Sequence, residues 1–287
     1  MGMTMIKKLL GIAPQLESDG SFRPSKLAMK LAVPKKTNYA PVEYDQVTGD
    51  RSQILVVLTE QKNMTMQNGK MFSTGNHPVE VILPMLHLHS AGFEFVIATP
   101  NGMPAVFEMW AMPADDKAVL DFYQLFKSQF DAPHNLAEME GVLDETKYAA
   151  VFVPGGHGVM LGIPEDQNVG RVLRWAHENS LFTITLCHGP GALLSTQMDG
   201  ESFLYEGYQM TVFPDSVDKQ TPMIGYLPGH MPWMLCERLI ELGVTITNTK
   251  SDDSTCKDRN LLTGASPLAA NALGKLATQT LVEFLSS

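Results

Sequence analysis

Apolar runs alternate with helix-like segments along this chain, and the alternation predicts its fold. The runs most typical of strands are apolar at successive positions, which indicates burial on both faces, as in a central parallel strand. The predicted strands are residues 54–59, 93–99, 148–153, 183–186, 208–213, 244–248 and 260–263. The predicted helices are residues 77–91, 115–130, 135–143, 166–178, 231–242 and 268–285. This order predicts an α/β protein whose parallel sheet is covered by helices on both faces.

The same pattern divides the chain into an N-terminal piece and one large domain. Residues 1–50 mix lysine, proline and polar positions without a clean period, so we expect an arm or small cap there. Residues 51–287 contain all the predicted strands and form the α/β domain. Between the second and third strands, we expect an inserted small region at about residues 103–147.

Composition and charge narrow the function classes. The chain has 287 residues, 44% of them hydrophobic, and a formal net charge of −10, which argues against a general nucleic-acid or anionic-membrane surface. No apolar run approaches the roughly 20 residues that span a bilayer, so we expect no membrane partner. The three cysteines, Cys187, Cys236 and Cys256, have no CxxC spacing. A disulfide framework or zinc knuckle is therefore not supported, and a reducing cytoplasm is the expected location.

The strongest candidate chemistry lies in residues 183–194, TITLCHGPGALL. A β-branched apolar run ends at Cys187, a Gly-Pro-Gly turn follows, and a helix is expected from Ala192. A cysteine at a helix start is exposed to the helix dipole, which lowers thiol pKa values to roughly 3.5–7.5. His188 follows directly and can carry a proton. The alternative is a small cysteine packed at a strand end.

Other candidate side chains fall where the predicted strands end, which is the edge at which open parallel sheets bind ligands. Glu80 begins a helix, and it is either a catalytic carboxyl group or a first-turn cap. Gly155 and Gly156 offer two backbone amides to an oxyanion, or form an ordinary tight turn. Asp215 or Asp218 could orient His188, or both could be caps or solvated charges. Structural or surface roles are expected for His77, His87, His157, His177 and His230.

Several stretches resemble a known family. The general signatures are VFVPGGHG at 151–158, TLCHGPGALL at 185–194 and FPDSVDKQ at 213–220. These resemble the PfpI-like branch of the class I glutamine-amidotransferase-like superfamily. More specific stretches are NGKMFSTGNHPVE at 68–80, LHLHSAGFEF at 86–95, WAMP at 110–113 and LTGASPLAANALGKLA at 262–277. They are similar to the bacterial HchA family, and the resemblance implies a flavodoxin-like parallel-sheet sandwich with a small extra domain, forming a homodimer.

The resemblance also implies roles for individual residues. The family's catalytic cysteine, histidine and aspartate match Cys187, His188 and Asp218, and its active-site glutamate matches Glu80. Cys187 would add to an aldehyde, the amides of residues 155 and 156 would hold the oxyanion, and Glu80 would move protons with a pKa raised by burial.

A metal site is implied as well, but this chain departs from it. The family's histidine and glutamate ligands match His89 and Glu94, whereas Phe126 stands where the family has a further histidine. Zinc in proteins usually has at least three protein ligands. We therefore expect weak or absent zinc binding, and no cofactor is required by the expected chemistry.

The activity implied by the resemblance is that of a glutathione-independent glyoxalase, which converts methylglyoxal to D-lactate. The family is also described as a protein and nucleotide deglycase and as a stress-related holdase chaperone. The expected partners are small reactive aldehydes such as methylglyoxal and glyoxal, glycated proteins or nucleotides, and unfolded client proteins. The alternatives are a chaperone without significant enzyme activity and a cysteine peptidase.

Overall fold

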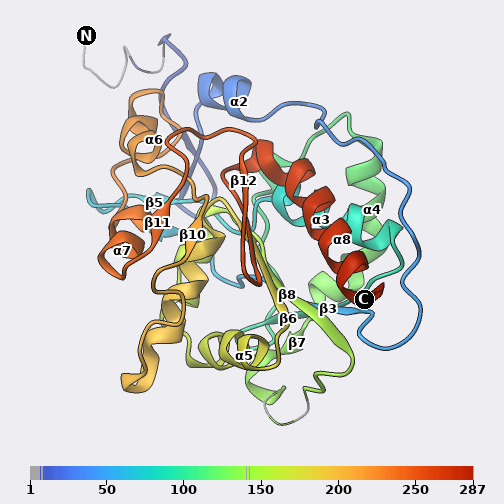
Figure 1. The fold of residues 1–287 in the computed structure, drawn as a ribbon. Helices are drawn as coiled ribbons and strands as arrows, with labels where there is room; N and C mark the ends of the chain where they lie inside the picture. Colours follow the sequence, from blue (N-terminus) through green and yellow to red (C-terminus); the bar gives the residue numbers. More distant parts are fainter. Residues whose placement is uncertain (1–6, 8, 140, 142, 287) are drawn as a thin grey trace.

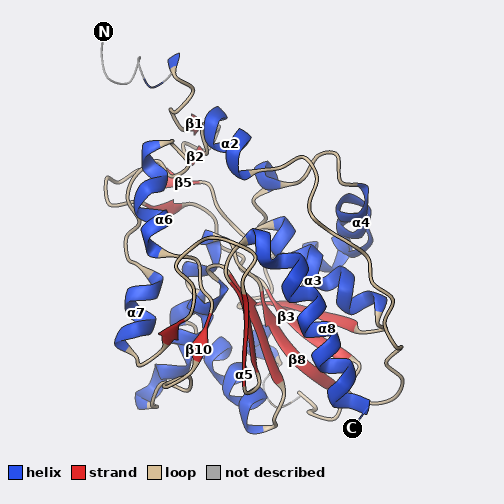
Figure 2. Cartoon of the chain, turned by 45° about the horizontal axis from the view of Figure 1, so that its top comes forward, coloured by secondary structure: helices blue, strands red, loops and turns tan. Residues whose placement is uncertain are grey.

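A seven-stranded sheet forms the centre of the protein, as Figure 2 shows in red between blue helices. The structure is a computed structural model that describes residues 7, 9–139, 141 and 143–286. In spatial order the strands are β12 (Thr255–Asp258), β13 (Leu261–Gly264), β9 (Phe182–Leu186), β8 (Tyr148–Val153), β3 (Gln53–Val57), β6 (Glu94–Thr99) and β7 (His134–Asn135). All neighbours are parallel except β12, which pairs antiparallel with β13 at the edge.

Helices cover both faces of this sheet (Figure 1). One layer contains α3 (Pro78–Ser90), α4 (Lys117–Asp131) and α8 (Ala270–Ser286), and the other contains α5 (Gln167–Glu178) and the 3₁₀ helix η5 (Gly189–Gly200). The central strand β3 shows why the sheet needs helices on both faces. Its side chains alternate, so that Ile54 and Val56 pack in the core under α3 and α8, while Leu55 and Val57 pack in the core under α5. The predicted flavodoxin-like α/β class is confirmed.

Smaller elements surround the end of the sheet where the parallel strands terminate. The four-stranded sheet consists of β1 (Gln15–Leu16), β2 (Phe22–Arg23), β5 (Met71–Phe72) and β4 (Met64–Thr65). A separate parallel pair consists of β10 (Gln209–Met210) and β11 (Thr245–Ile246). The remaining α-helices are α2 (Lys26–Ala32), α6 (Asp215–Gln220) and α7 (Leu235–Glu241). The short 3₁₀ helices are η1 (Met109–Ala111), η2 (Leu136–Glu138), η3 (His157–Met160), η4 (Ile163–Glu165), η6 (Thr221–Met223) and η7 (Pro267–Ala269).

Some predicted elements differ from the structure. The strands expected at 208–213 and 244–248 shrink to β10 and β11, which stand outside the main sheet. The edge strand β12 was not predicted, because its residues TCKD are only half-buried or exposed and lack an apolar run. In the stretch 135–143, where a helix was expected, the described residues contain the single turn η2, and residues 140 and 142 lie outside the described part of the chain. No helix in the described part of the chain combines the length and apolar character needed to cross a membrane.

The N-terminal arm contacts the domain at several points along its described residues. Its two strands join β4 and β5 in the four-stranded sheet. Beyond α2 the arm runs as an extended segment past α4 and α8, shown in blue in Figure 1. There Thr37 donates two hydrogen bonds to Asp116, and the hydroxyl group of Tyr44 lies 2.8 Å from His87 Nδ1. These contacts fix the arm across the outer layer of helices.

Candidate active site

Cys187 occupies a sharp turn at the carboxyl end of β9. Its φ is +59°, a conformation that non-glycine residues adopt rarely and mostly at functional sites. Its N–H donates to the carbonyl of Gly264 at 2.8 Å, and its carbonyl accepts from the N–H of Phe213 at 2.9 Å. The helix predicted after the turn is the 3₁₀ helix η5. These bonds hold the side chain, which is 3% exposed, in one direction.

Gly155 and Gly156 allow the backbone after β8 to approach this turn closely. A Cβ at Gly155 would lie 2.0 Å from Glu80 Oε2 and 2.9 Å from Cys187 Cβ, so any side chain would collide with the centre of the site. Gly156 has a φ of +108°, which is readily available only to glycine. The amide of Gly155 faces the carboxyl group of Glu80, whereas Gly156 lines the cavity. Their role in holding an oxyanion stays a prediction.

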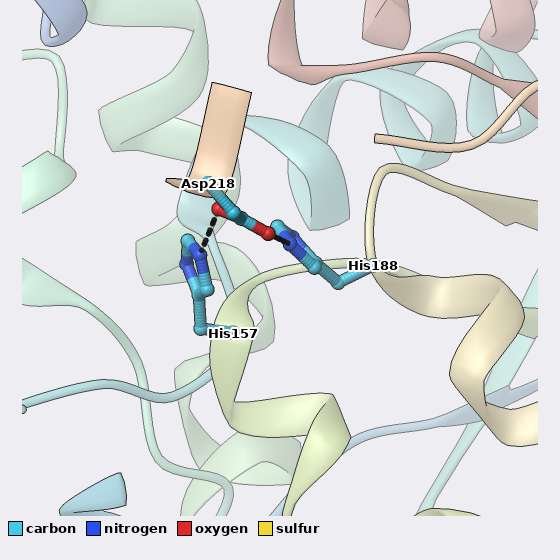
Figure 3. A group of neighbouring side chains, drawn as sticks. All are labelled: His157, His188 and Asp218. Atoms are coloured by element: carbon cyan, nitrogen blue, oxygen red, sulfur yellow. Dashed lines mark hydrogen bonds and ion pairs between the residues drawn. The ribbon is translucent and has the colours of Figure 1, made fainter. Parts of the chain in front are cut away.

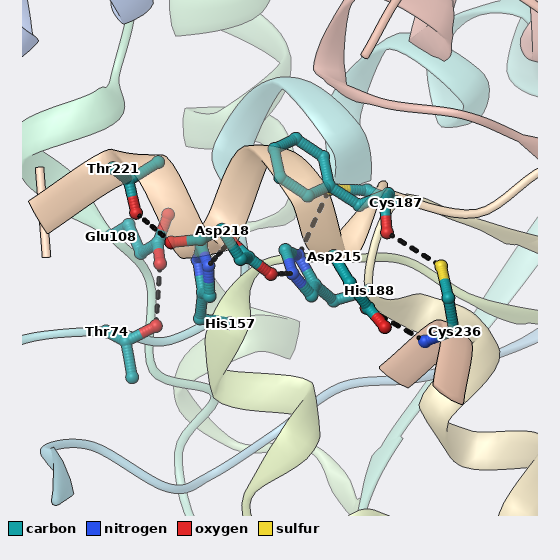
Figure 4. Close-up of polar contacts among 10 residues, drawn as sticks. Thr74, Glu108, His157, Cys187, His188, Asp215, Asp218, Thr221 and Cys236 are labelled. Carbon is teal, nitrogen blue, oxygen red and sulfur yellow. Dashed lines mark hydrogen bonds and ion pairs between the residues drawn. The ribbon is translucent and has the colours of Figure 1, made fainter. Parts of the chain in front are cut away.

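Cys187, His188 and Asp218 form a hydrogen-bonded chain (Figure 4). The Cys187 Sγ lies 3.3 Å from His188 Nδ1, and His188 Nε2 lies 2.7 Å from Asp218 Oδ2. Because an ionised carboxylate only accepts, Nε2 carries the proton, and Nδ1 is left to accept from the thiol. The three residues predicted as nucleophile, base and orienting carboxylate are therefore brought together in that order.

His157 is a further member of the site that the sequence reasoning placed among structural or surface histidines. Its Nε2 lies 3.0 Å from Asp218 Oδ1, so Asp218 bridges two imidazoles, as Figure 3 shows. The two rings lie 4.0 Å apart between centroids. Burial would raise the pKa of Asp218, but the two imidazoles and their hydrogen bonds hold it well below its usual range. The carboxylate is thus ionised at neutral pH.

Glu80 stands in the first turn of α3 and is 1% exposed. Neither oxygen of its carboxyl group has a well-aligned hydrogen bond among the described residues, and His77 Nδ1 lies 3.9 Å from Oε1. Burial raises the pKa of Glu80 well above its ordinary value, although the adjacent Cys187 thiol and Gly155 amide lower it. The raised pKa that was expected is confirmed, and burial favours the protonated form of Glu80.

The expected lowering of the Cys187 pKa is wrong. Burial raises the pKa of the thiol well above its ordinary value, and the neighbouring carboxyl groups of Glu80 and Asp218 raise it further. The N–H of His188 lowers it, as a helix start should, but this effect is smaller than the cost of burying a charge. The thiol therefore rests protonated, and it needs the adjacent His188 Nδ1 to accept its proton during reaction.

These groups lie at a cavity of about 620 Å³. Residues 31–38 of the arm and Pro267–Leu268 before α8 contribute to its wall. His77 also faces this space, although a structural or surface role was expected for it. Burial lowers the pKa of His77 to about 3, which keeps this imidazole neutral. The cavity is large enough for a side chain carrying an adduct, and not only for a small aldehyde.

The structure distinguishes the roles of Asp215 and Asp218, which the sequence left as alternatives for orienting His188. Asp215 points away from His188 and accepts hydrogen bonds from the amides of Cys236 and Glu237, each at 2.9 Å, so it caps the start of α7 (Figure 4). Cys236 contacts the carbonyl of Phe213 at 3.3 Å. Both residues therefore serve packing and capping beside the site.

The metal ligands implied by the resemblance do not form a zinc site. The His89 ring lies among phenylalanine rings, with centroids 5.6 Å from Phe122 and 5.9 Å from Phe126. His89 and Glu94 are both exposed. In the part of the chain that the structure describes, the only trio of ligand atoms close enough to share an ion belongs to His157, His188 and Asp218, which already hydrogen-bond to one another. The residues at the implied site do not fit the metal.

Comparisons with known proteins show the family and the fold of this chain. No protein-family model matches the chain. It is 45% identical over 272 residues to the protein/nucleic acid deglycase HchA of Escherichia coli O157:H7, covering 94% of this chain and 95% of the relative. Glyoxalase III from Candida albicans has a similar fold, with a TM-score of 0.61 at 20% identity over 79% of this chain and 96% of that structure. The Rapid Encystment Protein of 24 kDa from Francisella tularensis gives a TM-score of 0.68 at 18% identity over 80% and 98%. The chain therefore belongs to the HchA family of protein/nucleic acid deglycases.

Proposed function

We propose that this protein converts methylglyoxal to D-lactate without glutathione, and that it removes early methylglyoxal and glyoxal adducts from proteins and nucleotides. The observation that carries the proposal is the position of the Cys187 thiol, between the carboxyl group of Glu80 and the imidazole of His188 at the wall of a cavity of about 620 Å³. The deglycase name of the 45% identical relative supports the same chemistry.

The first step joins the thiol to the aldehyde. As the sulfur of Cys187 bonds to the aldehyde carbon, the thiol proton passes to His188 Nδ1, 3.3 Å away, and returns to the new oxygen to give a hemithioacetal. The ionised Asp218 stabilises the imidazolium that forms in between. Gly156 at the cavity wall is the proposed donor to the developing oxyanion.

Glu80 then moves protons along the substrate. Its acid form gives a proton to the ketone oxygen while its other oxygen takes the proton from the former aldehyde carbon, which produces an enediol. In the return step Glu80 gives that proton to the second carbon and takes one from the first hydroxyl group. The product is a lactyl thioester, and Glu80 is protonated again. Water then releases lactate and restores the thiol. A raised pKa suits this role because the cycle starts from the acid form.

A cysteine peptidase fits the site less well. The Cys187 side chain is 3% exposed, so a reacting group must enter the cavity to reach it. A small aldehyde or the end of a glycated side chain meets this requirement, whereas a peptide bond in a polypeptide backbone has to bring its flanking chain as well.

A holdase activity is proposed to reside elsewhere than the thiol. Leu31 and Leu268 are 66% and 54% exposed although both are large and apolar, and both contribute to the cavity wall. Such exposed apolar side chains fit binding of unfolded client proteins. The homodimer belongs to the same proposal and rests on the family resemblance. The cytoplasmic location is also proposed, and it rests on the three cysteines without CxxC spacing.

The test is D-lactate production from methylglyoxal by the wild type and by Cys187→Ser, with Cys236→Ser as the matched control. We expect the first variant to lose activity and the second to keep it. More than a trace of activity in Cys187→Ser would remove Cys187 from its role. Aggregation of a heated client protein, followed with the same variants, should be suppressed equally by wild type and Cys187→Ser. If Cys187→Ser no longer suppressed aggregation, the chaperone and enzyme activities would not be separate.

A further inference from the structure

A second buried carboxyl group lines the same cavity and has no part in the steps above. Glu108 precedes η1 and is 1% exposed. Its Oε1 accepts a hydrogen bond from the hydroxyl group of Thr74 at 2.7 Å, whereas its Oε2 has no well-aligned partner among the described residues. The backbone amides of Gly75 and His157 also face this carboxyl group. A buried oxygen without a well-aligned donor at a cavity wall is available to a ligand.

The position of Glu108 is fixed by its surroundings. Its N–H donates to the carbonyl of Asn76 at 3.0 Å, and its own carbonyl accepts from Ala111 at 2.7 Å. Figure 4 shows its carboxyl group beside His157, whose ring lies 4.0 Å from that of His188. Burial raises the pKa of Glu108 to about 7, although His157 and the Thr74 hydroxyl group lower it. Near neutral pH such a group both holds and releases a proton readily, as a general acid must.

The proposed substrates differ in their need for such an acid. Methylglyoxal has no leaving group, and His188 and Glu80 together handle its protons. A glycated amine is an aminocarbinol, in which a carbon–nitrogen bond must break. The departing nitrogen has to be protonated, because an amide anion is too basic to leave in water. Glu80 is engaged with Cys187, so the acid must come from another group in the cavity.

We propose that Glu108 is the general acid that protonates the departing amine of a glycated substrate, and is thus a catalytic residue specific to amine adducts. The inference rests on the proposed function. The carbon–nitrogen bond breaks with its electron pair on nitrogen, which takes the proton of Glu108. The carbinol oxygen becomes a carbonyl as its proton passes to His188. The proton on His188 then returns to Glu108 through cavity water, which restores both groups. The freed aldehyde is captured by the Cys187 thiol, with sulfur bonding to carbon and the thiol proton passing through His188 to the oxygen, so the cycle balances.

The test compares three substrates: methylglyoxal itself, its adduct with N-acetyllysine, and its adduct with N-acetylcysteine. A thiolate leaves without protonation, so the cysteine adduct is the matched control for the lysine adduct. Release of lysine and cysteine is measured in single turnovers with an independent aldehyde scavenger present. Spontaneous dissociation, measured without protein, is then subtracted. Glu108→Gln keeps the shape of the side chain and removes its acid.

We expect Glu108→Gln to lower the ratio of lysine release to methylglyoxal conversion at least tenfold, and to lower the ratio of lysine release to cysteine release similarly. Thr74→Val removes the hydroxyl group that holds Glu108 and should shift both ratios in the same direction by a smaller factor. Thr74→Val therefore tests the role of Glu108 if the Glu108→Gln variant does not fold. Glu80→Gln should instead raise the ratio of lysine release to methylglyoxal conversion, because Glu80 acts only after the carbon–nitrogen bond has broken.

Equal losses on all three substrates, or no loss on any, would overturn the role of Glu108. So would a wild type that converts methylglyoxal but releases lysine only at the spontaneous rate. A wild type inactive on methylglyoxal and on both adducts would instead contradict the proposed function itself, and the two failures are therefore distinguishable.

Discussion

Glu80 and Asp218 lie beside the Cys187–His188 pair and are buried to a similar degree, 1% and 2% exposed. Their surroundings nevertheless shift their pKa values in opposite directions. Asp218 accepts from two imidazoles, and these hold its pKa well below its usual range. Glu80 has no well-aligned donor, and burial raises its pKa well above its usual range. The comparison teaches that hydrogen-bond partners, more than burial, decide whether a carboxyl group here is a fixed anion or a mobile acid.

The largest expected effect is a greater loss of catalytic rate at Glu80 than at Asp218. Glu80→Gln keeps a hydrogen-bonding head but cannot exchange a proton, and we expect a loss of roughly 10²–10⁴ in the rate of methylglyoxal conversion. Asp218→Asn removes only the orientation and charge behind His188, so its loss should be smaller. Steady-state rates of D-lactate formation measure both. Wild-type kinetics in Glu80→Gln would return Glu80 to the role of a first-turn cap.

The second effect concerns stability and its dependence on pH. Asp218→Asn removes the buried charge and replaces one of its two acceptor oxygens with an NH₂ group, so one of the two buried imidazoles loses its acceptor. The free energy of unfolding should fall by about 3 kcal/mol at neutral pH. Folded Asp218 remains ionised at pH values where the unfolded chain binds a proton. Its contribution is therefore complete above the ordinary carboxyl pKa of about 3.9 and is lost as pH falls below it.

Urea unfolding of wild type and Asp218→Asn at a series of pH values checks this dependence. The difference between the two proteins should be constant from pH 7 to about 5 and shrink as the pH falls below about 4. A difference that grew on acidification would show that Asp218 is not the ionised member of the pair.

A smaller effect is expected at Asp215, the other aspartate of α6. It caps α7 through the amides of Cys236 and Glu237, so Asp215→Ala should lower the free energy of unfolding by about 1 kcal/mol. Its kcat/KM for methylglyoxal should stay near that of the wild type. Loss of activity without loss of stability would reverse the assignment of the two aspartates.

The smallest effect is expected from metal removal. Since Phe126 occupies a ligand position of the implied zinc site, chelation should leave methylglyoxal conversion unchanged. Phe126→His should raise the zinc content of the purified protein, measured by atomic absorption, if His89 and Glu94 keep the family geometry. Stoichiometric zinc in the wild type that chelators remove only slowly would contradict this prediction.

The sequence predicted the parts of the site that follow directly from strand ends. Cys187 and Gly156 follow the end of an apolar run, and Glu80 begins the helix after the first such run. A parallel sheet brings these points to one edge. By the same rule His157 could have been included, because it follows β8 within the same turn as Gly156.

The remaining features depend on contacts between distant segments. Nothing local marks Glu108, which lies in the inserted region and reaches the cavity through its bond to Thr74, 34 residues earlier. The pKa of Cys187 was predicted in the wrong direction because burial and the nearby carboxyl groups of Glu80 and Asp218 come from tertiary packing. The half-buried edge strand β12 has no apolar period to predict it.

The opposite states of the two carboxyl groups can be observed directly. Infrared difference spectra between wild type and Glu80→Gln, and between wild type and Asp218→Asn, isolate the carboxyl band of each residue at pH 7. The account predicts the band of a protonated carboxylic acid for Glu80 and the paired bands of a carboxylate for Asp218. A carboxylate signal from Glu80, or a protonated acid at Asp218, would contradict it.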